Sequence, residues 1–209
     1  MGVLLAPELR AALERGARHV GVTLDEPVVE LLGRYLDLLV VWNRKINLTA
    51  VRDAADIVTR HFVDSLAVAP FLPTAAATLV DVGSGAGFPG AVLAAVRPGL
   101  AVTLVESSHK KAAFLRTIRR ELPLSALTVL TERAEALPGQ AGFQPFDVAV
   151  SRATWGLLDW LPIGVSLVRR PGGLVIGMEG AERHTLPAGA RRIDYSLDGA
   201  RRALVLRNT

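Results

Sequence analysis

The segment Asp81-Val-Gly-Ser-Gly-Ala-Gly-Phe-Pro-Gly90 decides the fold class of this 209-residue chain. It follows a short apolar run at 78–82 and precedes an alanine-rich stretch at 91–96 that is typical of a helix. Glycines at 83, 85 and 87 let the backbone turn sharply and keep Cβ atoms away from a ligand. A loop of this kind between a buried strand and a helix predicts a ligand crevice at the carboxyl end of the strand.

On the C-terminal side of this loop, apolar runs alternate with amphipathic stretches. This alternation predicts an α/β protein with a doubly wound, mostly parallel sheet of seven strands. A turn at Asp198-Gly199 between the last two runs predicts an antiparallel C-terminal hairpin. The expected strands are 78–82, 101–105, 127–130, 146–151, 173–176, 192–195 and 203–207, and the expected helices are 91–96, 110–122 and 157–168.

The N-terminal third has a different, helical pattern from Pro7 to about Pro70. A predicted helix starts at Asp25-Glu26-Pro27 and carries one apolar stripe, and a second helix is expected over 54–69. We therefore expect a helical extension, residues 1–73, packed on an α/β domain, residues 74–209, as one compact unit. The stripe consists of Leu31, Tyr35, Leu38, Leu39 and Trp42.

Composition excludes several classes of protein. Half of the residues are hydrophobic and 21% are charged, as in ordinary globular domains. The sequence has no cysteine, which excludes disulfides and thiolate sites, and its four histidines are scattered, so no metal site is expected. No apolar run reaches the roughly 18 uncharged residues of a membrane span. We expect a cytoplasmic monomer with no membrane contact.

The net charge of +4 arises at the C-terminal end, where residues 169–209 carry eight arginines and four acidic residues. Such an excess permits an anionic partner such as nucleic acid, but does not establish one.

Two cofactor classes are compatible with the glycine loop. Gly85-x-Gly87-x-x-Gly90 matches the dinucleotide fingerprint, whereas Gly83-x-Gly85-x-Gly87, preceded by Asp81, matches loops that bind S-adenosylmethionine (AdoMet). An acid after the second strand, here Glu106, would bind ribose hydroxyls in either class. Asp81 would repel a pyrophosphate and attract a sulfonium, which favours AdoMet, and a turn without a ligand is the remaining alternative.

Further motifs carry a resemblance to a known family. Trp42-Asn-Arg-Lys-Ile-Asn-Leu-Thr49, Arg60-His61, Asp64-Ser65-Leu66 and Phe88-Pro89-Gly90 resemble the glucose-inhibited division protein B family, bacterial small-subunit rRNA guanine-N7 methyltransferases. The resemblance runs from about residue 25 to the C-terminus. The first motif is specific to this family, whereas many methyltransferases share the glycine loop. Additional matches are Val105-Glu106-Ser107, Lys110-Lys111, Phe114-Leu115, Arg133-Ala134-Glu135 and Ser151-Arg152-Ala153.

The resemblance implies a class I methyltransferase fold that methylates N7 of one guanine in the decoding-region loop of 16S rRNA. AdoMet would be the donor and S-adenosylhomocysteine the product, and the substrate would be the small ribosomal subunit or an assembly intermediate. By position, Gly83 and Phe88 would contact AdoMet, and Arg152 would sit at the donor end. The other implied contacts are Glu106, Ser107 and Ser108 with the ribose, Ala134 and Glu135 with the adenine, and Asp81, Gly85 and Gly87 as additional cofactor-binding candidates.

One position departs from the family pattern. Met178-Glu179-Gly180 stands where the family usually has a lysine before the glycine, which reverses a charge near the expected active site. If that lysine meets rRNA phosphate, we expect a compensating charge from the nearby Arg183.

Guanine N7 has an in-plane lone pair in the neutral base, so methylation there needs positioning rather than a general base. No catalytic residue is therefore predicted. Arg152 is the candidate for orienting the substrate, because a guanidinium can pair with a base O6 or a phosphate. The alternative for this arginine is a structural ion pair with Asp147 or Asp159.

The remaining polar candidates each have a structural alternative. Arg44, Lys45, Arg52, Lys110 and Lys111 are predicted phosphate contacts, with a solvated face as the default. Asn43 and Asn47 are expected to cap a helix or pack rather than to bind a base, and His61 and Asp64 to form a polar pair or a half-buried, satisfied histidine. Trp155 and Trp160 are expected in the core, and Arg191, Arg192, Arg201 and Arg202 on the edge hairpin.

Three rival functions stay open at this point: a methyltransferase of the same fold with a small-molecule or protein substrate, a nicotinamide or flavin oxidoreductase, and an rRNA-binding factor with a degenerate site.

Overall fold

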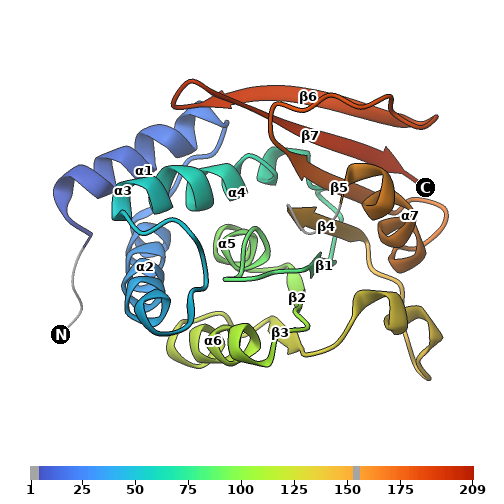
Figure 1. The fold of residues 1–209 in the computed structure, drawn as a ribbon, viewed down its shortest axis with the longest axis horizontal. Coiled ribbons are helices and arrows are strands. Elements are labelled where there is room, and N and C mark those ends of the chain that lie inside the picture. The colour runs from blue at the N-terminus through green and yellow to red at the C-terminus, as the bar shows by residue number, and fades with distance from the viewer. Residues whose placement is uncertain (1–4, 153–155) are drawn as a thin grey trace.

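The chain forms one mixed sheet with strand order β3-β2-β1-β4-β5-β7-β6, in a computed structural model that describes residues 5–152 and 156–209 (Figure 1). The first five strands run parallel, β7 is antiparallel to β5, and β6 is antiparallel to β7. The predicted doubly wound sheet and its C-terminal hairpin are confirmed. The strands are β1 (Thr78–Val82), β2 (Ala101–Val105), β3 (Leu127–Leu130), β4 (Val148–Arg152), β5 (Leu174–Glu179), β6 (Ala190–Leu197) and β7 (Ala200–Asn208).

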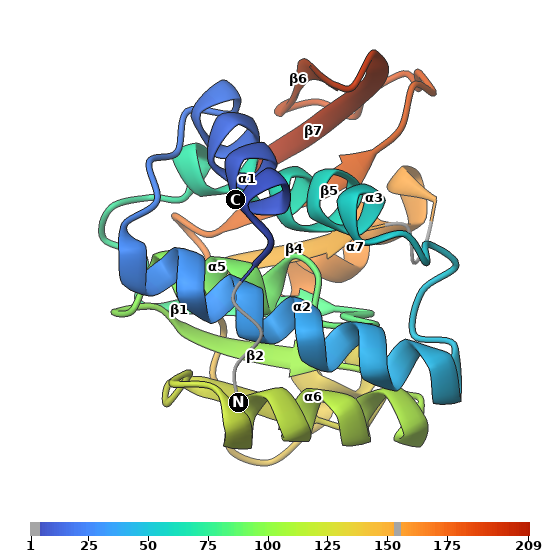
Figure 2. The same ribbon diagram turned by 90° about the vertical axis from the view of Figure 1, so that its left-hand side faces the viewer.

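Helices cover both faces of the sheet, because its parallel strands are apolar on both sides. Leu79 of β1 belongs to one buried cluster with α5 (Gly90–Val96), whereas its neighbour Val80 belongs to a second cluster with α7 (Leu157–Leu167). Figures 1 and 2 show α5 and α6 (His109–Glu121) on the first face and α7 on the opposite face.

The N-terminal helices add a further layer outside α5 and α6. α2 (Glu26–Ile46) lies across both of these helices in Figure 2. It begins as predicted, since Asp25 accepts a hydrogen bond from the Val28 N–H (3.0 Å). Leu31, Tyr35 and Leu39 of its stripe are buried and belong to the same cluster as the sheet residue Leu79. The domain boundary expected at residue 73 stays a prediction.

The second expected helix is broken into short pieces. α1 (Pro7–His19) packs against them, and the segment from residue 54 divides into α3 (Ala54–Ile57), a π-helix η1 (Val58–Val63), α4 (Asp64–Leu66) and a 3₁₀ turn η2 (Ala69–Phe71). A π-helical turn widens the backbone locally and is frequent at functional sites. This one contains His61 and is followed directly by Asp64.

Two local details differ from the sequence expectation. β4 begins at Val148 rather than at residue 146, and the Asp147 carboxylate at the strand entrance accepts hydrogen bonds from the N–H groups of Ala77 (2.6 Å) and Thr78 (2.9 Å). A 3₁₀ helix, η3 (Ala134–Gly139), lies between β3 and β4 and was not predicted. Within the described ranges, no helix is both long and apolar enough to cross a membrane.

We predict that Gly90→Ala destabilises the fold by about 2 kcal/mol, since overpacking a rigid contact costs about this much. An added Cβ would lie 2.7 Å from the Asp81 Cβ and 2.5 Å from Leu104 Cδ2. Urea unfolding measures the change. Gly99→Ala is the matched control, because nothing lies within 4 Å of its added Cβ. Equal stability of the two variants would contradict the close packing of α5 on β1.

Candidate functional site

A cavity of about 770 Å³ opens at the carboxyl ends of the parallel strands. The strand order reverses at β1, which has β2 on one side and β4 on the other, and Val82 of β1 is in register with Ser151 of β4. Ligands of doubly wound sheets bind at such a switch point. Of the predicted site residues, Gly83, Gly85, Phe88, Glu106, Ser107, Lys111, Ala134, Glu135 and Arg152 line this cavity.

The glycine loop forms one wall. Gly83 and Gly85 have φ angles of 71° and 58°, which favour residues without a Cβ. A Cβ at Gly85 would meet only the Gly83 carbonyl oxygen, at 3.9 Å, so this side of the loop is open to a ligand. Gly87 does not line the cavity; an added Cβ there would collide with the hydroxyl of Tyr35, which itself donates a hydrogen bond to the Ala86 carbonyl.

Glu106 connects this loop to the start of α6. Its Oε2 accepts a hydrogen bond from the Gly85 N–H (2.9 Å), and its Oε1 accepts one from the Ser108 N–H (2.8 Å). Each carboxylate oxygen has a second lone pair, so the buried side chain can still accept hydrogen bonds from hydroxyl groups in the cavity. Ser107 lines the cavity beside it, whereas Ser108 contributes the backbone N–H and is not part of the wall.

Phe88 forms an aromatic wall further along the cavity. It is buried and stacks on Tyr35, with ring centroids 5.5 Å apart, and on His61, at 4.9 Å. The guanidinium carbon of Arg152 lies 5.2 Å from the centre of the Phe88 ring. The guanidinium of Arg152 and the rings of Phe88 and His61 therefore lie together in the cavity wall.

Asp81 lies beneath the loop rather than in the cavity wall. It is fully buried, its Oδ2 accepts a hydrogen bond from the Gly90 N–H (2.8 Å), and its Oδ1 has no partner among the described residues. Burial raises the pKa of this carboxyl to about 7, although the Gly90 N–H lowers it. The structure therefore gives Asp81 a role in holding the loop on α5.

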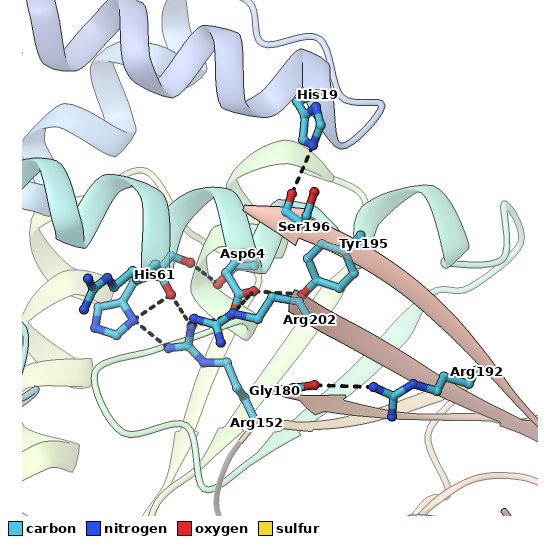
Figure 3. A network of polar contacts seen from close by, with 11 residues as sticks. His19, His61, Asp64, Arg152, Gly180, Arg192, Tyr195, Ser196 and Arg202 are labelled. Atoms are coloured by element: carbon cyan, nitrogen blue, oxygen red, sulfur yellow. Dashed lines mark hydrogen bonds and ion pairs between the residues drawn. The ribbon is translucent and has the colours of Figure 1, made fainter. Parts of the chain in front are cut away.

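Arg152 is held at the end of β4 by groups from the N-terminal region (Figure 3). Its guanidinium pairs with the Asp64 carboxylate (3.2 Å), donates to the Arg60 carbonyl (3.1 Å) and lies 3.2 Å from His61 Nδ1. The alternative for Arg152, an ion pair with Asp147 or Asp159, is not the pair that forms: Arg152 pairs with Asp64, whereas Asp147 lies at the other end of β4 and pairs with Arg169 (2.8 Å).

His61 and Asp64 do not contact one another directly but meet at Arg152. His61 Nε2 lies 2.7 Å from the Thr49 hydroxyl, and burial, with the nearby charge of Arg152, lowers the pKa of the imidazole to about 3. The ring is therefore neutral at physiological pH. Sequence reasoning did not select Thr49, although it closes the family-specific motif and lines the cavity.

Both asparagines of that motif have structural roles, as expected. Asn43 is buried, donates to the Val51 carbonyl (3.1 Å) and accepts from the Thr49 N–H (2.9 Å). Asn47 ends α2 in the left-handed conformation, with φ at 49°. Arg52 donates to Asn47 and is exposed, and neither it nor the exposed Arg44, Lys45 and Lys110 lines the cavity.

The charge of Glu179 is balanced by an arginine of the hairpin, and the compensating phosphate contact expected of Arg183 stays a prediction. Arg192 pairs with Glu179 (3.0 Å), whereas Arg183 pairs with Asp194 (3.3 Å). The expectation that Arg192 and Arg202 only decorate the edge was wrong. Arg192 is largely buried, and Arg202 lines the cavity and lies 3.6 Å from the Asp64 carboxylate.

The core prediction for Trp160 is confirmed, because its indole is buried and donates to the Ile176 carbonyl (3.0 Å). Trp155 and Ala153 lie outside the described residues. Among those that are described, no group of three or more histidine and acidic side chains is placed to hold a metal ion.

A mostly parallel seven-stranded sheet, an antiparallel β7 beside β5 and a glycine loop after β1 define a class I methyltransferase fold. A putative O-methyltransferase from Klebsiella pneumoniae has this fold with a TM-score of 0.61 and 15% identity, over 95% of this chain and 97% of that one. A cofactor-bound protein from MTB gives a TM-score of 0.60 and 17% identity, over 87% and 89% of the two chains. At these identities the likeness concerns the fold alone.

Sequence comparison identifies the family. The model of the family described as rRNA small subunit methyltransferase G matches residues 28–200, so the chain belongs to this family. Ribosomal RNA small subunit methyltransferase G of Xanthomonas euvesicatoria pv. vesicatoria is 47% identical over 88% of this chain and 85% of that protein. The proteins of the same name from Xanthomonas oryzae pv. oryzae and Burkholderia pseudomallei are 43% identical (97% and 97% covered) and 44% identical (88% and 82% covered).

Asp81 and His61 are expected to give opposite pH dependences of the unfolding free energy. A single substitution at each position separates the two contributions. The raised pKa of Asp81 makes the folded state bind an extra proton between about pH 4 and 7, so its stabilisation is lost as pH rises through that range. The lowered pKa of His61 makes the unfolded state bind the extra proton between about pH 3 and 6.5, so its contribution is lost as pH falls.

We predict that Asp81→Asn becomes more stable relative to wild type as pH rises from 4.5 to 7, by about 1 kcal/mol per pH unit at most. His61→Gln should show the opposite slope between pH 4.5 and 6.5. Urea unfolding of the three proteins at several pH values measures both differences. Slopes of the same sign in the two variants would contradict the assigned environments.

Proposed function

We propose that this protein transfers the methyl group of AdoMet to N7 of a guanine in small-subunit rRNA. The observation that carries the proposal is the cavity at the switch point of the sheet, which combines an open glycine loop, the buried Glu106 and Arg152 in a chain of the rRNA small subunit methyltransferase G family. Cofactor and substrate would share this one cavity, with the cofactor at the glycine loop and the guanine near Arg152.

The residues of the wall fit AdoMet. Gly83 and Gly85 present backbone without Cβ atoms, and Glu106 offers free lone pairs for the two ribose hydroxyls next to Ser107. Ala134 and Glu135, at the start of η3, border the end of the cavity proposed for the adenine, with Phe88 toward the donor end. Ser108 donates its N–H to Glu106 and so orients this carboxylate. Asp81 and Gly87 lie beneath the loop and support its backbone from outside the cavity.

When bound, AdoMet supplies an electrophilic methyl group on a positively charged sulfur. The in-plane lone pair of guanine N7 would form the new bond to this carbon while the carbon–sulfur bond breaks, so S-adenosylhomocysteine would leave and the positive charge would move to the purine. No proton has to be removed from N7, and the lowered pKa of His61 makes this imidazole a poor proton acceptor, so it is not needed as a base. The protein supplies in-line positioning and excludes water.

Arg152 is the group proposed to orient the guanine. Its guanidinium lines the cavity beside the Phe88 ring, where it can donate to the guanine O6 or to a phosphate. Lys111 lines the same cavity, whereas Arg44, Lys45, Arg52 and Lys110 are exposed outside it and are proposed as contacts with more distant phosphates. We further propose that the protein acts as a cytoplasmic monomer on 16S rRNA within the small subunit or an assembly intermediate.

The cofactor assignment predicts that Glu106→Gln weakens AdoMet binding by about 10- to 100-fold, because hydrogen bonds to a charged acceptor contribute about 1.5–3 kcal/mol. Titration calorimetry measures the dissociation constant, and thermal unfolding checks that the variant is folded. Glu121→Gln, at the exposed end of α6, is the matched control and should bind AdoMet as wild type does. Heat with NADH but none with AdoMet would refute the assignment.

The substrate assignment predicts where the label from methyl-labelled AdoMet appears. Naked 16S rRNA, small subunits and total cellular protein are incubated in parallel, and the digested nucleosides are analysed by mass spectrometry. We expect N7-methylguanosine in one or both RNA-containing samples and no label in protein. Labelled protein with unlabelled RNA would overturn the proposed substrate.

A further inference from the structure

One buried carboxylate, Asp64 of α4, contacts side chains from three strands of the sheet (Figure 3). Its Oδ1 accepts a hydrogen bond from the Tyr195 hydroxyl of β6 (2.8 Å) and lies 3.6 Å from Arg202 Nε of β7. Its Oδ2 pairs with Arg152 of β4 (3.2 Å). Only 5% of the residue is exposed, although it reaches the wall of the proposed active site.

The position of Asp64 follows from the local backbone. It is the first residue of α4, directly after the π-helical turn that carries Arg60 and His61. The turn and the first residue of α4 present three groups to Arg152: the Arg60 carbonyl, the His61 ring and the Asp64 carboxylate. Of these groups, the carboxylate carries the negative charge.

The balance of charge around the cavity explains why a carboxylate is needed at this point. Among the described residues, the wall contains five basic and five acidic side chains, but Glu106, Glu132 and Glu135 belong to the segments that follow β2 and β3. Near Arg152 and Arg202 the acid in contact is Asp64, while Glu179 is already paired with Arg192. Without Asp64, two guanidinium groups would face each other in a partly buried site, which is costly.

This balance bears directly on the chemistry, because the proposed reaction moves a positive charge from sulfur to the purine. Two uncompensated arginines beside the purine would oppose that movement. A carboxylate between them offsets the repulsion and fixes the guanidinium of Arg152 on the Phe88 ring. Displacement of a positioned group by about 1 Å can lower a rate by about 100-fold.

From this juxtaposition we infer that Asp64 is a positioning residue of methyl transfer: it holds Arg152 at the substrate end of the cavity and neutralises the arginine pair. The inference rests on the proposed function and adds to it a residue outside the methyltransferase domain expected from the sequence. Asp64 acts through Arg152 and does not itself contact the proposed cofactor region.

The test compares kcat, the KM for rRNA, the AdoMet dissociation constant and the unfolding temperature of full-length variants. Asp64→Asn should lower kcat by about 30-fold while the AdoMet dissociation constant changes by less than about threefold, because the displaced group acts in the transfer step. Asp147→Asn is the matched control. It removes another buried, arginine-paired carboxylate, at the opposite end of β4, and should lower the unfolding temperature with kcat unchanged within about threefold.

A wild-type kcat in Asp64→Asn, or equal losses of kcat in Asp64→Asn and Asp147→Asn, would overturn the inference. If Asp64→Asn does not fold, Asp64→Glu carries the test. It keeps the charge, and the longer side chain shifts the guanidinium, so kcat should fall about tenfold with AdoMet binding retained; an unchanged kcat would again overturn the inference. Wild-type protein that methylates no rRNA would instead refute the proposed function, so the two failures are distinguishable.

Discussion

The close approach of α5 to β1 is the constraint on which the rest of the structure depends. Gly90 has no side chain, so the first turn of α5 rests directly on Asp81, and its N–H donates to the Asp81 carboxylate (2.8 Å). This contact sets where the chain turns after β1 and keeps the backbone of Gly83 and Gly85 facing the cavity. A larger residue at position 90 would move the helix and close the crevice from below.

The acidic side chains in and beneath the cavity have different roles because their environments differ. Asp81 is fully buried and holds the helix, and burial raises its pKa to about 7. Glu106 bridges two loops through backbone N–H groups and keeps lone pairs for a ligand. Asp64 and Glu179 each face an arginine, so the substrate end of the cavity is polar without a large net charge.

The N-terminal helices build part of the site, besides covering the sheet. Thr49, His61 and Asp64 all lie before β1, yet they line the same cavity as the glycine loop. Tyr35 of α2 stacks on Phe88 and donates to the Ala86 carbonyl, which joins the first long helix to the loop. A substitution in this region can therefore change the chemistry without touching the sheet.

The sequence alone determined the order of the strands and of the helices between them, the ligand loop and the family. These features follow from local periodicity, from glycines at fixed spacing and from contiguous motifs, all of which are properties of neighbouring residues. Most of the predicted cofactor-binding residues also line the cavity, since they follow strands whose carboxyl ends must meet at one edge. Tertiary structure alone decided the partners of the charges. Arg152 pairs with Asp64 rather than Asp147, because the fold brings the start of α4 to the end of β4. Arg192 pairs with Glu179, because the antiparallel register of β5, β7 and β6 places these two distant segments side by side.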